Sequence, residues 1–141
     1  MSIALPDGYH LREGADAVAA HGYLSRSYWA TGIPLETVRQ SLENSFAISV
    51  LHGTGQVSMA RVITDYTTFA YLADVYVLEA HRGLGLSKAM VAFLRAHPRL
   101  QNLRRWALCT LDAQPLYRQF GWVEYPHPER MMTLDNPDIY G

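Results

Sequence analysis

The chain has 141 residues, 49% hydrophobic and 18% charged, a composition that predicts one soluble globular domain over residues 1–141. Its net charge of −1 gives no electrostatic reason to expect a nucleic acid or an anionic membrane as a partner. The single cysteine, Cys109, excludes an intrachain disulfide and fits a reducing cytoplasm. It lies in an apolar run, where we expect a small buried hydrophobe. No histidine pair has metal-binding spacing and no apolar run is long enough to span a membrane, so we expect neither a metal nor a membrane.

The first third of the chain predicts a strand followed by two helices. Residues 9–13 alternate apolar and polar side chains, as a half-buried strand does, and residues 15–25 favour a helix. Residues 25–33 make a turn-rich loop with several aromatic side chains. Pro34 then suits the first turn of a second helix, whose apolar residues recur on one face. We therefore expect a helix–loop–helix unit after the first strand.

The middle of the chain predicts an antiparallel meander that leads into a buried strand. Residues 46–52 and 56–63 indicate two strands joined by a glycine-bearing hairpin, and a turn at Asp65 leads to residues 71–78. The last of these segments is nearly continuous in β-branched, aromatic and aliphatic side chains, as expected of a central strand covered on both faces. Asp74 alone interrupts it with a charge.

A glycine-bearing turn joins this strand to an amphipathic helix. The apolar residues of segment 86–94 recur at the spacing of one helix face, and the pattern ends before a proline. Gly83 and Gly85 precede the helix, where unpaired N–H groups and the helix dipole favour an anion and missing Cβ atoms let phosphate oxygens approach. The glycines alone fit a tight turn that binds nothing equally well, but the flanking cations Arg82 and Lys88 favour an anion site.

The spacing of this turn excludes two common phosphate-binding motifs. A Rossmann fingerprint needs a third glycine, where this chain has Lys88, and a Walker loop needs four residues between its glycines and a following Lys-Ser or Lys-Thr. The segment Arg82-Gly83-Leu84-Gly85-Leu86-Ser87 instead resembles the Q/R-x-x-G-x-G/A turn of the GNAT superfamily of acetyl-CoA-dependent N-acyltransferases. Ser87 stands where that family usually has Gly or Ala.

The last third predicts another strand, a short helix and two final strands. Residues 105–110 should run parallel to the strand at 71–78, because a helix connects the two. Segment 112–120 begins with a capping aspartate and an early proline and ends before a glycine, which favours a short helix. Residues 122–125 and 131–134 are expected to complete the sheet.

A second family match lies in this last third. Leu116-Tyr117-Arg118-Gln119-Phe120-Gly121-Trp122 resembles the L-Y-x-x-x-G-F segment of GNAT proteins, with Trp122 in place of Phe. The resemblance implies an α/β fold with a mixed, mostly antiparallel sheet, two splayed parallel central strands and helices on both faces, and it places the pantetheine arm of acetyl-CoA between the splayed strands. The cofactor contacts that it implies are Val75, Tyr76 and Val77 in the strand and Arg82, Gly83, Leu84, Gly85, Leu86, Ser87 and Lys88 in the turn.

Acyl transfer to an amine requires an acceptor for a proton, because an alkylamine is mostly charged at neutral pH and exposing the neutral nucleophile costs roughly 4–5 kcal/mol. Asp74 is the predicted base or amine anchor, although it could instead face solvent or pair with Arg61. Glu79, in the turn, is a weaker candidate. By resemblance, Tyr117 is the general acid that protonates the departing CoA thiolate; the alternative is a core tyrosine whose hydroxyl bonds a backbone carbonyl.

The residues leave two classes of function open. The first is an N-acetyltransferase that acts on a small-molecule or peptide amine, with Tyr28 and Trp29 as substrate contacts or as packing residues. The second is a CoA-binding sensor that keeps the phosphate turn without turnover, but a sensor needs no acid such as Tyr117 beside the sulfur. A dinucleotide-binding oxidoreductase is disfavoured by the chain length and the missing glycine. The acceptor amine and the oligomeric state stay open, a homodimer included.

Overall fold

The protein is described here by a computed structural model, which covers residues 3–141. Over this range the chain forms a five-stranded mixed sheet in the order β1-β2-β3-β4-β5, antiparallel except for the parallel pair β4-β5. The strands are β1 (Tyr9–Glu13), β2 (Phe46–His52), β3 (Gly55–Thr64), β4 (Phe69–Val77) and β5 (Arg105–Leu108), and the helices are α1 (Ala17–Leu24), α2 (Leu35–Glu43), α3 (Leu86–Ala96) and α4 (Gln114–Arg118). The predicted fold class is confirmed.

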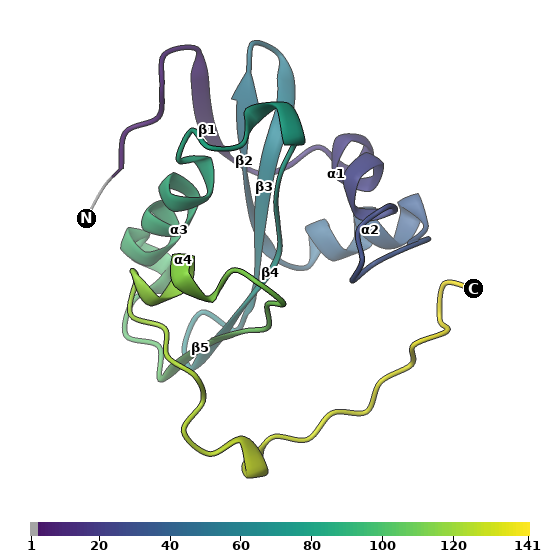
Figure 1. The fold of residues 1–141 in the computed structure, drawn as a ribbon, viewed down its shortest axis with the longest axis vertical. Helices are drawn as coiled ribbons and strands as arrows, with labels where there is room; N and C mark the ends of the chain where they lie inside the picture. Colours follow the sequence, from purple (N-terminus) through teal and green to yellow (C-terminus); the bar gives the residue numbers. More distant parts are fainter. Residues whose placement is uncertain (1–2) are drawn as a thin grey trace.

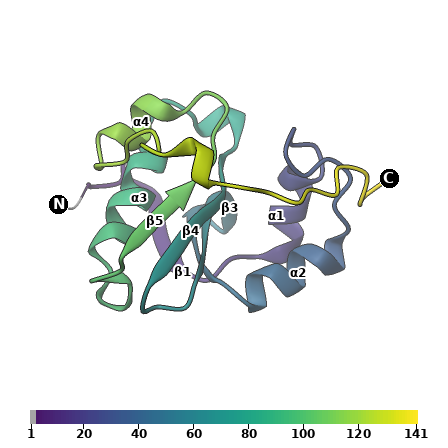
Figure 2. The ribbon, with the colours of Figure 1, turned by 90° about the horizontal axis from the view of Figure 1, so that it is seen from below.

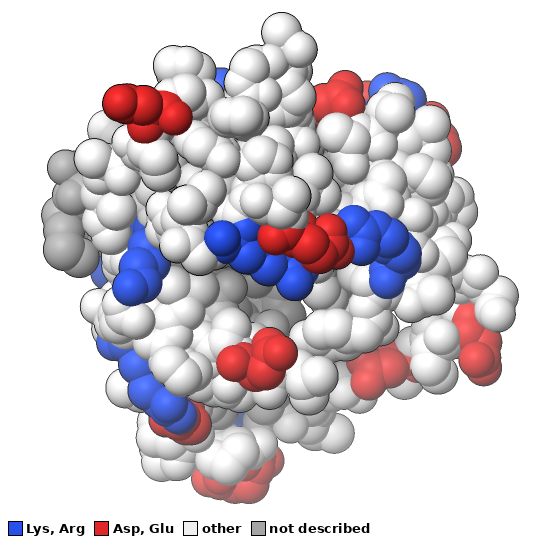
Figure 3. All heavy atoms as spheres, turned by 45° about the horizontal axis from the view of Figure 1, so that its top comes forward, with Lys and Arg blue, Asp and Glu red and all other residues white. Residues whose placement is uncertain are grey.

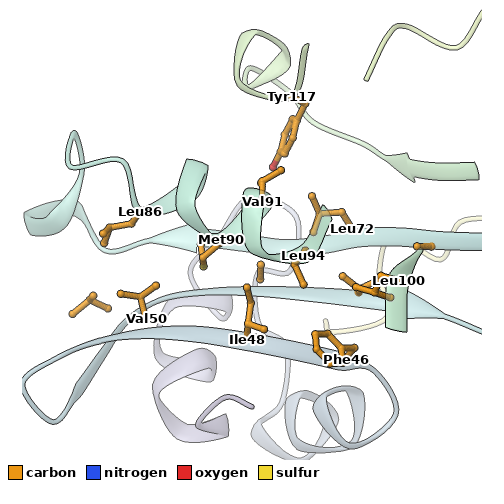
Figure 4. Close-up of a cluster of buried hydrophobic side chains, with 14 residues drawn as sticks. Phe46, Ile48, Val50, Leu72, Leu86, Met90, Val91, Leu94, Leu100 and Tyr117 are labelled. Carbon is orange, nitrogen blue, oxygen red and sulfur yellow. The ribbon is translucent and has the colours of Figure 1, made fainter. Parts of the chain in front are cut away.

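The helices cover both faces of the sheet (Figures 1 and 2). On one face α3 packs its apolar stripe on β2, β3 and β4, and Ile48, Met90 and Leu94 are fully buried there (Figure 4). On the other face α1 and α2 bury Leu24 and Val38 against the sheet. Each strand supplies both layers because successive side chains of a strand point to opposite faces.

Two irregularities of β4 shape the middle of the molecule. β4 pairs with β5 only from Phe69–Arg105 to Leu72–Leu108, and beyond these residues the two strands are no longer paired. On its other edge, the register between β3 and β4 shifts between Met59 and Arg61. Asp74 lies at this bulge with φ of +55°, in the left-handed region that a non-glycine residue rarely adopts. The part of β4 that no longer pairs with β5 therefore also contains the bulge at which Asp74 lies.

The two final strands were predicted wrongly. Residues 122–125 lie beside β5, where Trp122 contacts Trp106 and Tyr125 contacts Arg105, but they form no ladder. Met131, Met132 and Leu134 are 55%, 92% and 102% exposed, and this segment runs away from the sheet towards the side of α1 and α2 (Figure 2). Two prolines precede it, and proline supplies no N–H group for a ladder. β5 is consequently an edge strand in this structure.

The predicted boundaries of the other elements hold within a few residues, and the helices are short. Within residues 3–141, none of them combines the length and the apolar character that crossing a membrane requires.

Candidate functional site

A cavity of about 1140 Å³ opens where β4 and β5 separate. Its walls come from β4, the end of β5, the loop between α1 and α2, the start of α3, and α4. Figure 3 shows a hollow on this face of the molecule, next to a band of basic and acidic side chains. The cavity brings together the predicted residues Tyr28, Trp29, Asp74, Val75, Tyr76, Val77, Arg82, Gly83, Gly85, Leu86, Ser87, Lys88 and Tyr117. Leu84 and the weaker candidate base Glu79 do not line it.

The turn before α3 has the geometry of an anion site. Gly83 and Gly85 have φ of +80° and +81°, and a Cβ atom built on either glycine meets no other atom within 4 Å. Gly85 is the N-cap of α3, and no side chain caps the helix. The N–H groups of the first turn are therefore free to donate to a ligand, and the open space above the glycines admits a diphosphate. This part of the site has the donors and the open space that a diphosphate group requires.

Arg82 and Lys88 flank the turn in different ways. Arg82 donates from Nε to the carbonyl of Val77 and from a terminal nitrogen to the hydroxyl of Tyr23, each at 3.1 Å. Its guanidinium therefore connects the turn to β4 and to α1 by hydrogen bonds, and one terminal nitrogen has no hydrogen-bond partner among the described residues. Lys88 lines the cavity and, among the described residues, forms no ion pair. The uncommitted cation at this end of the cavity is Lys88.

Tyr117 is buried, with 7% of its surface exposed, and lines the cavity from α4. Its hydroxyl points towards α3 beside Val91 (Figure 4). Within residues 3–141 the hydroxyl makes no hydrogen bond, so the backbone carbonyl of the alternative interpretation is absent. Burial raises the pKa of Tyr117 to about 12. The phenol thus stays protonated at neutral pH and has a proton to donate.

Asp74 is held by two side chains from distant parts of the chain. Arg61 Nε donates to Oδ2 and Trp29 Nε1 donates to Oδ1, both at 2.9 Å. The alternative pairing with Arg61 is therefore present, and the carboxylate is 12% exposed. Each oxygen keeps a second lone pair, so Asp74 can still accept a hydrogen bond from an amine or a water in the cavity.

Glu79 is committed to an ion pair. Arg26 donates to its two carboxylate oxygens at 2.7 and 3.3 Å, and Arg82 lies 4.0 Å away. The hydrogen bond from Arg26 holds the pKa of Glu79 at about 2. A carboxylate with so low a pKa is a poor base, so the geometry argues against Glu79 as the proton acceptor.

Three residues beyond β5 and in α1 were not predicted as part of the site. Cys109 is exposed, so the prediction that it is buried is wrong, and it lines the cavity because β5 ends one residue earlier. Asp112 does not cap α4; Ala113 is the N-cap, and its N–H donates to the hydroxyl of Thr110. Tyr23 stacks on Tyr76 with ring centroids 4.4 Å apart. The local sequence carries no signal for these contacts.

Tyr71 faces the cavity next to Cys109. Burial, and then a hydrogen bond with Cys109, raises the pKa of Tyr71 to about 12. With Tyr23, Tyr28 and Trp29, it gives the part of the cavity around Asp74 an aromatic wall. No group of three potential metal ligands occurs among residues 3–141.

Comparison with known proteins identifies relatives of the chain. Residues 44–124 match the family model described as an acetyltransferase (GNAT) domain. FG08082 of Gibberella zeae, whose name marks it as a candidate acetyltransferase, is 32% identical over 130 residues, which is 78% of this chain and 73% of that protein.

Solved structures give the same picture. A crystal structure of a GNAT-family candidate acetyltransferase from Xanthomonas campestris pv. campestris is 40% identical, with a TM-score of 0.92 over 97% of this chain and 99% of that chain. A predicted acetyltransferase from Clostridium acetobutylicum, crystallised with acetyl-CoA, is 14% identical, with a TM-score of 0.68 over 90% of this chain and 96% of that chain. The second likeness concerns the fold alone.

Proposed function

Because this chain belongs to the GNAT family of acetyltransferases, we propose that it moves an acetyl group from acetyl-CoA to a primary amine by direct attack within a ternary complex. The observation that carries this proposal is one continuous cavity. It joins the uncapped start of α3 to the free hydroxyl of Tyr117 and to the carboxylate of Asp74. A phosphate site, a proton donor and a proton acceptor then line a single reaction chamber.

The donor half of the cavity would hold acetyl-CoA. The N–H groups from Gly83 to Lys88 would bind the diphosphate, and the backbone of Val75, Tyr76 and Val77 would contact the pantetheine arm. β5 does not pair with this part of β4, so the peptide groups on that edge are available. The crystal structure of the Clostridium acetobutylicum protein with acetyl-CoA supports this choice of donor by likeness of fold.

The transfer requires the charged amine to lose two protons and the sulfur to gain one. Asp74 takes the first proton from the ammonium group, directly or through a water, the neutral amine then attacks the thioester carbon, and the surplus proton of the adduct leaves to water. When the carbon–sulfur bond breaks, the CoA thiolate takes the proton of the Tyr117 hydroxyl. Burial raises the pKa of Tyr117 to about 12, so the phenol keeps its proton at neutral pH until charge develops on sulfur. Because a phenoxide with that pKa is a stronger base than a thiolate whose pKa is about 8.5, Tyr117 regains a proton from water after the transfer.

The test is an acceptor screen with acetyl-CoA and pooled amines, read by release of the CoA thiol and by mass spectrometry of the products. We expect thiol release that depends on an amine, together with an acetylated product. CoA binding without thiol release from any pool would instead support the sensor function. Absence of CoA binding would overturn both.

A further inference from the structure

Arg61 presents an open guanidinium to the cavity. It lies on β3 opposite Ala73, and its side chain is 14% exposed. Nε donates to Asp74, whereas neither terminal nitrogen has a hydrogen-bond partner among the described residues. Among the described residues, Trp122 Nε1 is the side-chain nitrogen or oxygen atom that is fully buried and has no hydrogen-bond partner. The terminal nitrogens of Arg61 have no partner either, so both are unpaired among the described residues and not completely buried.

The neighbouring arginines differ from Arg61 in this respect. Arg26 is bound to both oxygens of Glu79, and Arg82 donates to β4 and to α1. The hydrogen bond from Nε to Asp74 restrains the planar guanidinium of Arg61, and its two terminal nitrogens form a planar fork of donors. Such a fork matches the two oxygens of a carboxylate.

We propose, on the basis of the proposed function, that the acceptor is an amine with a carboxylate close to it, the arrangement of a free amino acid. Arg61 binds the carboxylate, and Asp74 accepts a hydrogen bond from the amine. The two protein groups are in contact at 2.9 Å, so the site offers opposite charges side by side, as a zwitterion does. An acceptor that lacks the carboxylate leaves the guanidinium fork without a partner.

The walls around this pair set the expected side chain of the amino acid. Tyr28, Trp29 and Tyr71 line the cavity, and Trp29 also donates to Asp74. Aromatic faces favour an apolar or aromatic substituent over a charged one. L-Phenylalanine is accordingly the probe, and L-phenylalaninamide is its match, because the two differ only in the carboxylate.

The experiment measures kcat/KM for both probes with saturating acetyl-CoA, in the wild type and in Arg61→Gln and Arg61→Lys. We expect the wild type to prefer the carboxylate and the acid-to-amide ratio to fall about tenfold or more in Arg61→Gln, with a smaller fall in Arg61→Lys. Loss of the ion pair between Arg61 and Asp74 changes kcat/KM for the acid and for the amide by the same factor. The acid-to-amide ratio therefore reports only the contact between Arg61 and the carboxylate of the substrate. Arg39→Gln, on the exposed surface of α2 beside Glu36, is the control and should keep the wild-type ratio.

Titration calorimetry of both probes into the CoA-loaded protein separates the two proposals. A preference for the acid that depends on Arg61, without turnover, supports the zwitterion site and contradicts the proposed function. Equal turnover of the acid, the amide and simple amines overturns the zwitterion site and leaves the proposed function standing. An acid-to-amide ratio that is the same in Arg61→Gln and in the wild type also overturns it.

Discussion

The part of the cavity proposed to hold acetyl-CoA, the donor half, and the part around Asp74 proposed to hold the amine, the acceptor half, are built in different ways. In the donor half the peptide backbone supplies the binding groups, at the start of α3 and along the unpaired edge of β4. In the acceptor half side chains from three separate segments supply them, as Trp29, Arg61 and Asp74 show. A backbone site is fixed by the fold, whereas a side-chain site changes with single substitutions. We therefore expect variants of the two halves to fail in different measurements.

The largest expected effect is that of Tyr117→Phe, at the junction of the two halves. The substitution removes a hydroxyl that makes no hydrogen bond within residues 3–141 and keeps the ring that packs on Trp122. Loss of the general acid should lower kcat by roughly 10²–10⁴-fold, while CoA affinity and melting temperature stay the same. Tyr66→Phe, outside the cavity, should leave kcat unchanged. Normal turnover in Tyr117→Phe would show that another group donates the proton to the CoA thiolate.

Gly85→Val tests the donor half by itself. A Cβ atom at Gly85 meets no other atom within 4 Å, so we expect the valine side chain to occupy the open space assigned to the diphosphate. Blocking two charge-assisted hydrogen bonds should weaken CoA binding by about 100-fold in titration calorimetry.

The control for this variant has to share its backbone strain. Gly14→Val also places a valine at a positive φ, +95°, where a built Cβ atom meets nothing within 4 Å, and Gly14 lies outside the cavity. It should bind CoA as the wild type does. If Gly85→Val stays folded by circular dichroism and retains full affinity, the diphosphate binds elsewhere.

The same contrast explains what the sequence could predict. Gly83 and Gly85 predict the donor turn from the local sequence alone, because glycine permits the left-handed backbone conformation there. The Asp74 contacts join residues 13 and 45 positions apart in the chain through a bulge that no local pattern indicates. Residues 131–134 were predicted to complete the sheet, but a strand also needs an edge to pair with, and tertiary structure decides that.

Asp74→Asn tests the acceptor half. The amide keeps the size of the side chain and can still accept from Trp29, but it loses the charge that takes up a proton. Acetylation near neutral pH should fall by about 10²-fold and recover partly at higher pH, where the amine loses its proton in solution. The pH–rate profile is the measurement, and CoA affinity should not change. An unaltered profile would leave Asp74 with a structural role alone.

The burial of Tyr117 also predicts a pH dependence of stability. Its pKa is about 12 in the folded protein and about 10 when unfolded, so the unfolded chain loses the proton first as the pH rises. The stabilising contribution is therefore complete below pH 10 and is lost between roughly pH 10 and 12. The free energy of unfolding, measured with urea, should fall by about 1.4 kcal/mol per pH unit from this group in that window. Tyr117→Phe should lack this part of the fall; the same slope in both proteins would contradict it.

The smallest expected effect is that of Arg82→Ala, which shows how far the donor half depends on backbone. The guanidinium is 55% exposed, and two of its nitrogens already donate to Val77 and Tyr23, so little of its charge is reserved for a ligand. The free N–H groups at the start of α3 remain in the variant. We expect CoA affinity to fall by only a few-fold, roughly 1 kcal/mol or less, because an exposed cation is screened by solvent. Lys88→Ala is the matched variant, since Lys88 has no ion-pair partner in the described chain, and it should weaken CoA binding more. A larger loss in Arg82→Ala than in Lys88→Ala would mean that the side chain of Arg82, rather than the backbone alone, shapes the turn that holds the diphosphate.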